Sequence, residues 1–230
     1  MQNSLNKLHL GCGNVSLAGW INIDLDSPGA DMNIDFTLPL PFADDSTSHI
    51  FSEHFIEHIT RQQAVSFLGE CKRVLSKNGV IRVSTPNLKF IAALYLAGIK
   101  DEWGELWQPS TLCQMLNEGM RSWGHQFVYD AQEIVSVFVE AGFNSISFQS
   151  YRKSQDPALC DLETRPFKNE IIIEARITDN KTIFIDDQEI ISIENRFLKN
   201  LDSKIWFKKN FYSGRASHYF RQIFSLFKGR

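Results

Sequence analysis

A short apolar strand that ends in two glycines constrains the fold of this chain most. Leu8 and Leu10 flank His9 in a pattern that predicts a buried strand, and Gly11 and Gly13 follow directly. Two glycines at this spacing indicate a sharp turn in which no side chain keeps a ligand away from the backbone. A glycine pair by itself is equally compatible with a plain turn, so its interpretation depends on the residues that follow.

An acidic residue near the end of the next predicted strand points to the kind of ligand. Residues 20–25 form a second apolar segment, and Asp24 lies near its end, 11 residues after Gly13. A carboxylate at this place accepts two hydrogen bonds, which suits the neighbouring hydroxyls of a ribose. The glycine turn and Asp24 together predict a binding site for a ligand that contains a nucleoside.

The rest of the chain alternates between predicted strands and helices. Thr60 is a helix N-cap with Gln63 as its capping-box partner, and Asn-Gly at 78–79 ends that helix. Asp130 caps a later helix, with Glu133 as its partner. Further strands are predicted at 31–36, 49–52, 80–84, 144–150 and 170–177, and a further helix at 87–99. This order predicts an α/β fold, a mostly parallel sheet with helices on both faces.

Length and composition predict one main domain with an appendage. At 230 residues, with 43% hydrophobic and 22% charged residues, the chain resembles a globular protein with a sizeable core. We expect the main domain at 1–178, with an insertion at 101–129 that covers the site, and a C-terminal extension at 179–230 that begins with a hairpin at 182–193. Because the four cysteines form no Cys-x-x-Cys pair and neither a signal core nor a membrane-spanning run is found, we expect free thiols and a cytoplasmic protein.

Charge is distributed unevenly along the chain, which indicates a partner for the C-terminal segment. Residues 196–230 hold nine basic residues and one acidic residue, a net charge of +8, whereas the other 195 residues hold 15 basic and 26 acidic residues, a net charge of −11. The segment also holds nine aromatic residues, and those from Tyr219 onward follow helical spacing. A basic amphipathic helix suits the anionic inner face of a membrane, and packing on the acidic body or pairing in a homodimer are the alternatives. No nucleic acid is expected as a partner, because no nucleic-acid-binding motif accompanies the charge.

Four blocks of residues together resemble the class I S-adenosylmethionine-dependent methyltransferases, and in particular a small bacterial branch often encoded near glycan-assembly genes. The blocks are residues 8–13, 19–24, 40–59 and 70–87. The resemblance covers roughly residues 7–178. It implies the Rossmann-like fold of that family, S-adenosylmethionine as the cofactor, and methyl transfer to a hydroxyl of a sugar, a lipid-linked glycan or another small molecule.

The resemblance also implies roles for individual residues. Gly11, Cys12 and Gly13 form the turn that passes beneath the cofactor, and Asp24 holds its ribose hydroxyls. The other cofactor-binding residues that the resemblance implies are Asp35 at the adenine amino group, Phe36 beside the adenine ring, and Ser52 and Glu53 at the methyl group.

Two departures from the family pattern, and two structural alternatives, bear on this site. His9 stands where many members have an acid, and Val15 stands where many have a third glycine. We expect His9 to steady the glycine turn and the cofactor as a neutral hydrogen-bonding group. The alternative role of Asp35 is to cap the following loop, and Glu57 and His58 suit capping of the following helix at least as well as catalysis.

Methyl transfer to a hydroxyl requires aligned reactants and a base, but it requires no metal. The candidate bases are His54, His58, His125 and Tyr129. The alternative function is that of a binding protein that keeps this fold without catalysis. A nicotinamide-dependent oxidoreductase is disfavoured, because it needs a third glycine and an acid about 20 residues further on.

Overall fold

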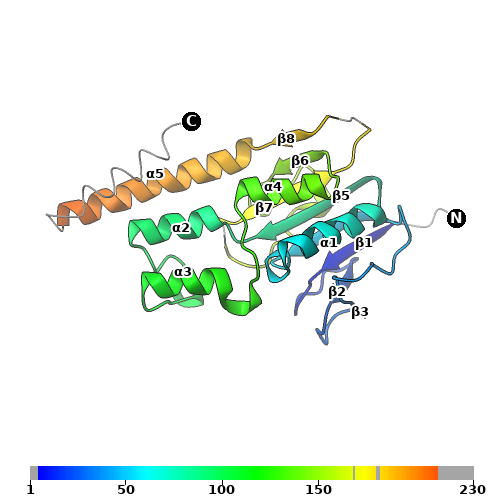
Figure 1. The fold of residues 1–230 in the computed structure, drawn as a ribbon, viewed down its shortest axis with the longest axis horizontal. Coiled ribbons are helices and arrows are strands. Elements are labelled where there is room, and N and C mark those ends of the chain that lie inside the picture. Colours follow the sequence, from blue (N-terminus) through cyan, green and yellow to red (C-terminus); the bar gives the residue numbers. More distant parts are fainter. Residues whose placement is uncertain (1–4, 168, 180–181, 212–230) are drawn as a thin grey trace. The chain divides into compact units, whose positions relative to one another are not determined.

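The structure, a computed structural model, describes residues 5–167, 169–179 and 182–211, with side chains described as far as residue 200 (Figure 1). Its centre is an eight-stranded sheet with the order β3-β2-β1-β4-β5-β7-β6-β8. All neighbouring strands are parallel except β7, which runs antiparallel to β5 and β6. The strands are β1 (Asn6–Leu10), β2 (Ile21–Asp24), β3 (Met32–Asn33), β4 (Thr47–Glu53), β5 (Leu75–Thr85), β6 (Ser145–Phe148), β7 (Ile171–Arg176) and β8 (Phe184–Asp186).

The order of the strands reverses between β1 and β4, and this reversal locates the site. From β1 the sheet continues to β2 and β3 on one side, and from β4 it continues to β5 on the other. Ligands of open α/β sheets bind beside the carboxyl ends of the strands at such a reversal. The predicted mostly parallel α/β sheet is confirmed, and the glycine turn follows β1 at this place.

Two helices, α1 (Arg61–Val74) and α4 (Ala131–Glu140), cover one face of the sheet (Figure 1). Their apolar sides and the strand residues that point toward them form one core, which burial of apolar area stabilises. The helices contribute Phe67, Leu68, Ile134 and Phe138, and the strands contribute Leu8, Leu10, Ile23 and Ile50. The remaining helices are α2 (Leu88–Ala97), α3 (Leu112–Arg121) and α5 (Gln188–Phe211), with short 3-10 helices η1 (Ile56–His58), η2 (Gly104–Leu106), η3 (Ser122–Gly124) and η4 (Pro157–Leu159).

The caps predicted for α1 and α4 are confirmed. The Thr60 side chain accepts a hydrogen bond from the Gln63 amide, and the Gln63 side chain accepts one from the Thr60 amide, which completes a capping box. At the start of α4 the Asp130 carboxylate accepts the Glu133 amide hydrogen at 2.8 Å. Side chains of the first turn therefore fix where both helices begin.

The helix end predicted at 78–79 is wrong. Helix α1 ends at Val74, and both residues lie within β5. A Cβ atom at Gly79 would lie 2.7 Å from Leu75 Cδ2 and 3.1 Å from the Thr47 carbonyl oxygen. Glycine is therefore present because β5 approaches its surroundings closely here, and not because a helix ends.

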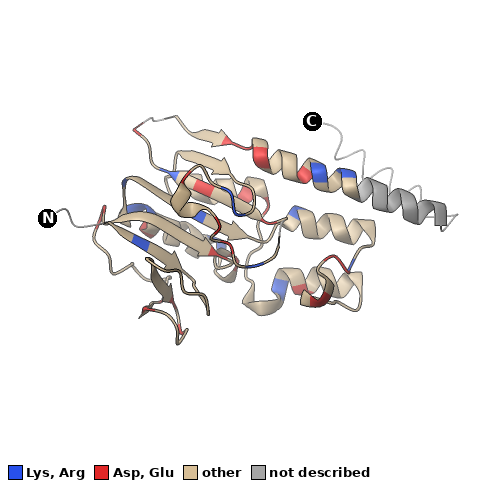
Figure 2. Cartoon of the chain, turned by 180° about the vertical axis from the view of Figure 1, so that it is seen from behind, with Lys and Arg blue, Asp and Glu red and all other residues tan. Residues whose placement is uncertain are grey.

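Irregular segments and η4 cover the other face of the sheet. Phe51 and Val80 pack there against Leu159 and Leu162, which follow β6 in the chain. Charged residues occur in the sheet as well as in the elements around it (Figure 2).

A buried ion-pair cluster anchors the segment between β6 and β7 to the sheet. Arg82 of β5 has no exposed side-chain surface, and it donates hydrogen bonds of 2.6 Å to Glu163 and to Glu174. Glu163 also accepts the amide hydrogen of Arg152 at 3.1 Å. Because Arg82, Glu163 and Glu174 are buried, the segment is held at a fixed position over the sheet.

The hairpin predicted at 182–193 is wrong, because this segment forms a strand and the start of a helix. Strand β8 pairs with β6 in parallel. The Asp186 carboxylate then accepts the amide hydrogen of Gln188, the first residue of α5, at 3.2 Å. Asp186 therefore begins a helix and does not form a turn between two strands.

The chain divides into two compact units, residues 1–194 and 195–230. The domain boundary predicted after residue 178 falls inside the first unit, which includes β8. Most of the basic segment predicted to bind a partner lies outside the described residues, since side chains beyond residue 200 are not described. Among the described helices, none is long and apolar enough to cross a membrane.

Candidate functional site

The glycine turn after β1 has the conformation that its sequence predicts. Gly11 and Gly13 have positive φ angles of 72° and 53°, which side chains with a Cβ atom adopt at a cost. The amides of Gly11 and Cys12 both donate to the Ile23 carbonyl oxygen, at 2.9 and 3.0 Å. A Cβ atom at Gly11 would lie 2.8 Å from Phe55 Cβ, whereas one at Gly13 would meet no atom within 4 Å. The turn is therefore packed on one side and open on the other.

Asp24 ties this turn to the end of β2. Its Oδ2 atom accepts the Gly13 amide hydrogen at 2.7 Å, and its Oδ1 atom accepts the Leu25 amide hydrogen at 2.8 Å. The Oδ1 atom also accepts the Asp26 amide hydrogen at 3.5 Å, whereas Oδ2 keeps a second lone pair, and the side chain is only half-buried. Asp24 is therefore held rigidly and can still accept a hydroxyl hydrogen at Oδ2.

His9 and Cys12 lie buried around the turn. His9 Nδ1 lies 3.1 Å from Asn22 Oδ1, and Asn22 in turn accepts the Leu17 amide hydrogen at 2.8 Å. Burial lowers the pKa of His9, so its ring is neutral at neutral pH. His9 thus supports the loop after the turn through Asn22. Burial raises the pKa of the Cys12 thiol, and a direct cofactor contact by either residue stays a prediction.

Asp35 and Phe36 have structural roles in the described residues. The Asp35 carboxylate accepts hydrogen bonds from the Thr37 amide at 2.8 Å and the Thr37 hydroxyl at 2.7 Å, so it caps the following loop. The Phe36 ring is 5% exposed and packs edge-on against Phe55 and Phe67 in the core. The predicted adenine contacts of both residues stay predictions.

Ser52 and Glu53, the two residues at the end of β4 that were predicted to bind the cofactor, differ in their contacts. Ser52 is fully buried, and no hydrogen bond to its hydroxyl is found among the described residues. The Glu53 carboxylate accepts the Thr164 hydroxyl at 2.6 Å and the amide hydrogens of Thr164 and Arg165 at 3.0 and 3.1 Å. Glu53 therefore anchors the loop that carries Arg165, a role that the sequence did not indicate.

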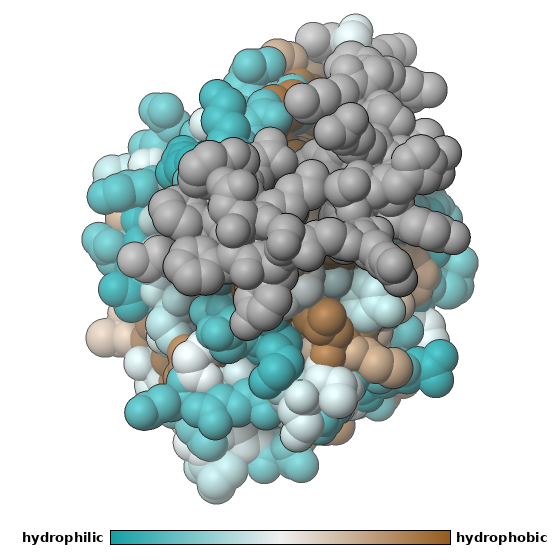
Figure 3. Space-filling view, turned by 90° about the vertical axis from the view of Figure 1, so that its left-hand side faces the viewer, coloured by the Kyte–Doolittle hydropathy of each residue, from teal (hydrophilic) through white to brown (hydrophobic). Residues whose placement is uncertain are grey.

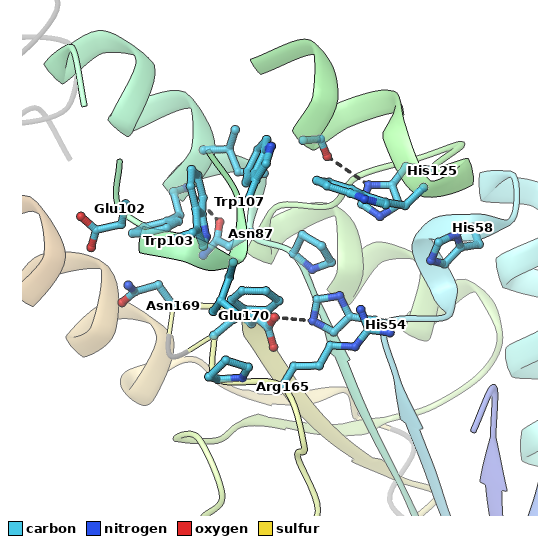
Figure 4. Close-up of a pocket in the computed structure, with 18 residues that line it drawn as sticks. His54, His58, Asn87, Glu102, Trp103, Trp107, His125, Arg165, Asn169 and Glu170 are labelled. Atoms are coloured by element: carbon cyan, nitrogen blue, oxygen red, sulfur yellow. Dashed lines mark hydrogen bonds and ion pairs between the residues drawn. The ribbon is translucent and has the colours of Figure 1, made fainter. Parts of the chain in front are cut away.

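A cavity of about 650 Å³ lies next to the end of β4, and the covering insertion supplies one of its walls (Figure 4). Its apolar wall consists of aromatic rings and a few aliphatic groups. Trp103 and Trp107 lie 4.3 Å apart between ring centroids, and Trp107 and Trp123 lie 5.2 Å apart. The polar lining consists of His54, His58, Asn87, Glu102, His125, Arg165, Asn169 and Glu170.

The outer surface near this wall is partly apolar. On the side of the first unit that carries α2 and α3, hydrophobic residues lie among hydrophilic ones (Figure 3). Leu106 and Trp123 expose 64% and 59% of their surface. Both residues also line the cavity, so part of the aromatic wall is exposed to solvent.

His54 lies between the carboxylates of Glu57 and Glu170, and Figure 4 shows its contact with Glu170 at the cavity. Its backbone has a φ of 53°, its Nδ1 atom lies 3.0 Å from Glu57 Oε1, and its Nε2 atom contacts Glu170 Oε1. Burial alone would lower the pKa of His54, but the hydrogen bonds to Glu170 and Glu57 outweigh it and raise the pKa to about 9. The raised pKa favours the protonated ring, which holds the two carboxylates, and the role of His54 as general base stays a prediction.

Glu170 is the carboxylate with a free oxygen in this cavity. Burial raises the pKa of Glu170, and the neighbouring His54 offsets this only in part. Its Oε1 atom contacts His54, while no hydrogen bond to the buried Oε2 atom is found among the described residues. This carboxylate oxygen is nearly buried, lines the cavity and receives no hydrogen bond from the described residues. It can therefore accept a hydrogen bond or a proton from a molecule bound in the cavity.

The structure separates the other two predicted bases. His125 lines the cavity, and its Nδ1 atom bonds with the Gly119 carbonyl oxygen at 3.0 Å. Tyr129 is fully buried in the core beside Phe127, and it does not line the cavity. Burial also raises the pKa of Tyr129. The buried place of Tyr129 outside the cavity lining does not favour the role of base, which stays a prediction for this residue.

Sequence reasoning missed Glu170 and Arg165, although one signal was present. Glu170 directly precedes the apolar strand β7. Because β7 is antiparallel to β5, its first residue lies at the edge where the parallel strands have their carboxyl ends. An acid at the start of a reversed strand was therefore a detectable candidate, whereas Arg165 lies in a loop without such a signal.

Comparisons with known proteins agree with this architecture. Residues 30–83 match the family model described as a methyltransferase domain. No curated protein matches the chain. An S-adenosylmethionine-dependent methyltransferase from Thermotoga maritima is 14% identical, with 76% of this chain and 83% of that chain covered and a TM-score of 0.50. One from Mesorhizobium loti is 17% identical, with coverage of 75% and 90% and a TM-score of 0.47. At these identities the likeness establishes the fold, a class I methyltransferase fold, and leaves the methyl acceptor open.

Proposed function

We propose that this chain is a class I S-adenosylmethionine-dependent methyltransferase and that it transfers a methyl group to a hydroxyl of a sugar or a sugar-containing small molecule. The family segment and the fold support the activity class and the cofactor. The observation that carries the acceptor class is the cavity, which combines an aromatic wall with a polar lining. A glycan attached to lipid is the larger form of the same acceptor.

The residues around the glycine turn fit the cofactor. When bound, S-adenosylmethionine supplies a methyl group that its sulfonium already activates. The half-buried carboxylate of Asp24 has a lone pair left at Oδ2 for a ribose hydroxyl, and the open side of Gly13 leaves room beside the backbone. Gly11, packed on Phe55, keeps the turn in place. These residues bind and orient the cofactor at the carboxyl ends of β1 and β2.

The cavity suits a molecule with apolar faces and polar edges. The C–H faces of a sugar ring pack well on aromatic rings such as Trp103 and Trp107, whose faces carry partial negative charge. Asn87, Asn169 and Arg165 provide amide and guanidinium groups for hydroxyls at the ring edge. Such a lining also excludes water from the reacting hydroxyl, which supports an in-line transfer.

Glu170 is the group best placed to take the proton of the reacting hydroxyl. Its Oε2 atom is unpaired among the described residues, and its raised pKa makes it a stronger acceptor than an ordinary glutamate. The protonated His54 ring holds the other carboxylate oxygen and stabilises the ionised form before the proton arrives. His54 is thus a positioning residue for Glu170.

The experiment that tests this function measures transfer of a labelled methyl group from S-adenosylmethionine to a panel of monosaccharides, nucleotide sugars and amines. We expect label in one or more hydroxyl acceptors and none in amines. Calorimetric titration with S-adenosylmethionine runs in parallel. Binding without transfer to any acceptor would favour the alternative of a non-catalytic binding protein, and absence of binding would contradict the proposal as a whole.

A further inference from the structure

We infer that Glu57, His58 and His125 form a binding site for a transition-metal dication at the margin of the cavity. One ligand atom from each of these residues lies within 4.8 Å of the others. Ligand atoms of a tetrahedral zinc site lie about 3.3 Å apart, given bonds of about 2.0–2.1 Å. Small side-chain rotations therefore bring the three atoms to bonding distance of one ion.

The backbone fixes the two segments that carry these ligands. The amides of Gln126 and Phe127 donate to the Glu57 carbonyl oxygen at 2.7 and 3.2 Å. The Gln126 side-chain amide donates to the His58 carbonyl oxygen at 2.8 Å. The residue next to His125 is thus bonded to both other ligand residues. The spacing of the three groups is preorganised and does not depend on a mobile loop.

The contacts of His125 determine which of its nitrogens is free. Its Nδ1 atom lies 3.0 Å from the Gly119 carbonyl oxygen, and a carbonyl oxygen only accepts hydrogen bonds. The hydrogen is therefore on Nδ1, and Nε2 carries the lone pair. A backbone carbonyl that orients a histidine ring in this way is the usual outer partner of a metal-binding histidine. The rings of His58 and His125 meet at 5.0 Å between centroids, and among the described residues neither ring nitrogen of His58 is hydrogen-bonded.

Glu57 supplies the negative charge of the site. It is fully buried, its Oε2 atom accepts the Thr85 hydroxyl at 3.0 Å, and its Oε1 atom lies 3.0 Å from His54 Nδ1. These contacts orient the carboxylate, and its remaining lone pairs are available to a metal.

Two imidazoles and one carboxylate indicate the class of ion. This ligand set suits zinc and neighbouring transition metals better than magnesium or calcium, which prefer oxygen ligands. Three protein ligands leave one coordination position open. His58 and His125 both line the cavity, so the three ligands lie at the edge of the proposed acceptor space (Figure 4). The sequence alone led to no expectation of a metal, because these ligands come from two distant segments that only the fold brings together.

Metal titration of the tag-free full chain tests this inference. The protein is first treated with a chelator, and Zn²⁺ binding is measured by calorimetry, with Co²⁺ absorption as the report of coordination. We expect one equivalent of Zn²⁺ and a cobalt spectrum of tetrahedral type. His58→Ala and His125→Ala should each weaken Zn²⁺ affinity at least about 100-fold, more than loss of an outer partner does.

A control variant at a histidine outside the proposed metal site, and a parallel measurement of S-adenosylmethionine binding, complete the test. His49→Gln removes a histidine that pairs with Asp156 away from the cavity, and it should leave Zn²⁺ affinity unchanged. Glu57→Gln is the conservative variant if an alanine variant fails to fold. Unaltered affinity in folded His58→Ala and His125→Ala, or no saturable binding to the unmodified chain, would overturn the inference. S-adenosylmethionine binding is measured on the same samples, so a failed metal site and a failed methyltransferase are told apart.

Discussion

The Asp24 carboxylate accepts the Gly13 amide hydrogen at 2.7 Å, so the end of β2 and the turn after β1 are joined by one short hydrogen bond. This bond makes Asp24 both a part of the turn and the proposed ribose ligand. Asp24→Ala should weaken S-adenosylmethionine binding by about 1.5–3 kcal/mol, as expected for lost hydrogen bonds to a charged group. Calorimetry measures the change. Asp26→Ala, an exposed acid two residues further on, is the control. Equal affinity in the two folded variants would remove Asp24 from the site.

Gly11 and Gly13 should respond differently to the same substitution. A Cβ atom at Gly11 meets Phe55 Cβ at 2.8 Å, whereas Gly13 has free space, and both residues have positive φ. Both changes to alanine should lower the free energy of unfolding by about 1–2 kcal/mol for the backbone conformation. Gly11→Ala should lose about 1–3 kcal/mol more through overpacking. Urea unfolding measures both values, and an equal loss would show that the turn does not pack on Phe55 as described.

Glu170→Gln should reduce turnover with little effect on cofactor affinity. The substitution keeps the shape of the side chain and removes its ability to take a proton, which should lower kcat about 10²–10⁴-fold. Because the pKa of Glu170 is raised, the rate of the unmodified enzyme should rise with pH as this group ionises, with a midpoint above the ordinary value of 4.5. Glu140→Gln, on the exposed side of α4, is the control. A pH–rate profile with the same acidic limb in Glu170→Gln would assign the limb to another group.

The buried cluster around Arg82 should contribute strongly to stability. Glu163→Ala leaves Arg82 with one carboxylate in a fully buried place, and breaking such a pair costs about 3–5 kcal/mol. Glu140→Ala breaks an ion pair with Arg61 whose side chains are 34% and 46% exposed, so the expected loss is within about 1 kcal/mol. Chemical denaturation of both variants measures the difference. Similar losses would mean that Arg82 is satisfied without Glu163.

The basic C-terminal segment should bring the chain to anionic membranes. Residues 196–230 carry a net charge of +8 and nine aromatic residues, and apolar burial and charge attraction add together at such a surface. The full chain should float with anionic vesicles at low salt, and a chain that ends at Asn195 should not. This end point keeps Glu194, which pairs with Lys89 at 2.5 Å. If the full chain stays at the bottom of the gradient, the alternatives of a homodimer or packing on the acidic body gain support.

Short sequence patterns correctly predicted the start of helices α1 and α4 and the glycine turn after β1, because these features depend on residues close together in the sequence. The capping box of Thr60 and Gln63 and the positive φ angles of Gly11 and Gly13 follow from side-chain chemistry within a few positions. Gly79 was misread, because its reason is the approach of Thr47 from another strand. A contact between segments far apart in sequence leaves no local signal.

The floor of the cavity was beyond sequence reasoning for the same reason. His54 was read as a base because a lone histidine gives no sign of its partners. In the fold it meets Glu57 from the same segment and Glu170, which directly precedes β7, and both carboxylates contact its ring nitrogens. Tyr129 lies close to His125 in sequence, but the bridge between Asn87 and Tyr129 draws it into the core. Proximity in sequence therefore did not imply a shared site.

The two walls of the cavity differ in how firmly they are attached, and this sets the route by which an acceptor enters. The wall with Arg165 is fastened by the bonds from Thr164 to Glu53 and by the Arg82 cluster. The wall with Trp103 and Trp123 has ring contacts, a bond from the Trp107 indole to Glu118 and neutral hydrogen bonds such as that of His125 to Gly119, but it has no buried ion pair among the described residues. Ring contacts slide at little cost, whereas buried ionic bonds do not. Exchange of acceptor and methylated product is therefore expected to proceed by displacement of the tryptophan side, so bulky acceptors should be admitted at a rate set by that wall and not by the chemical step.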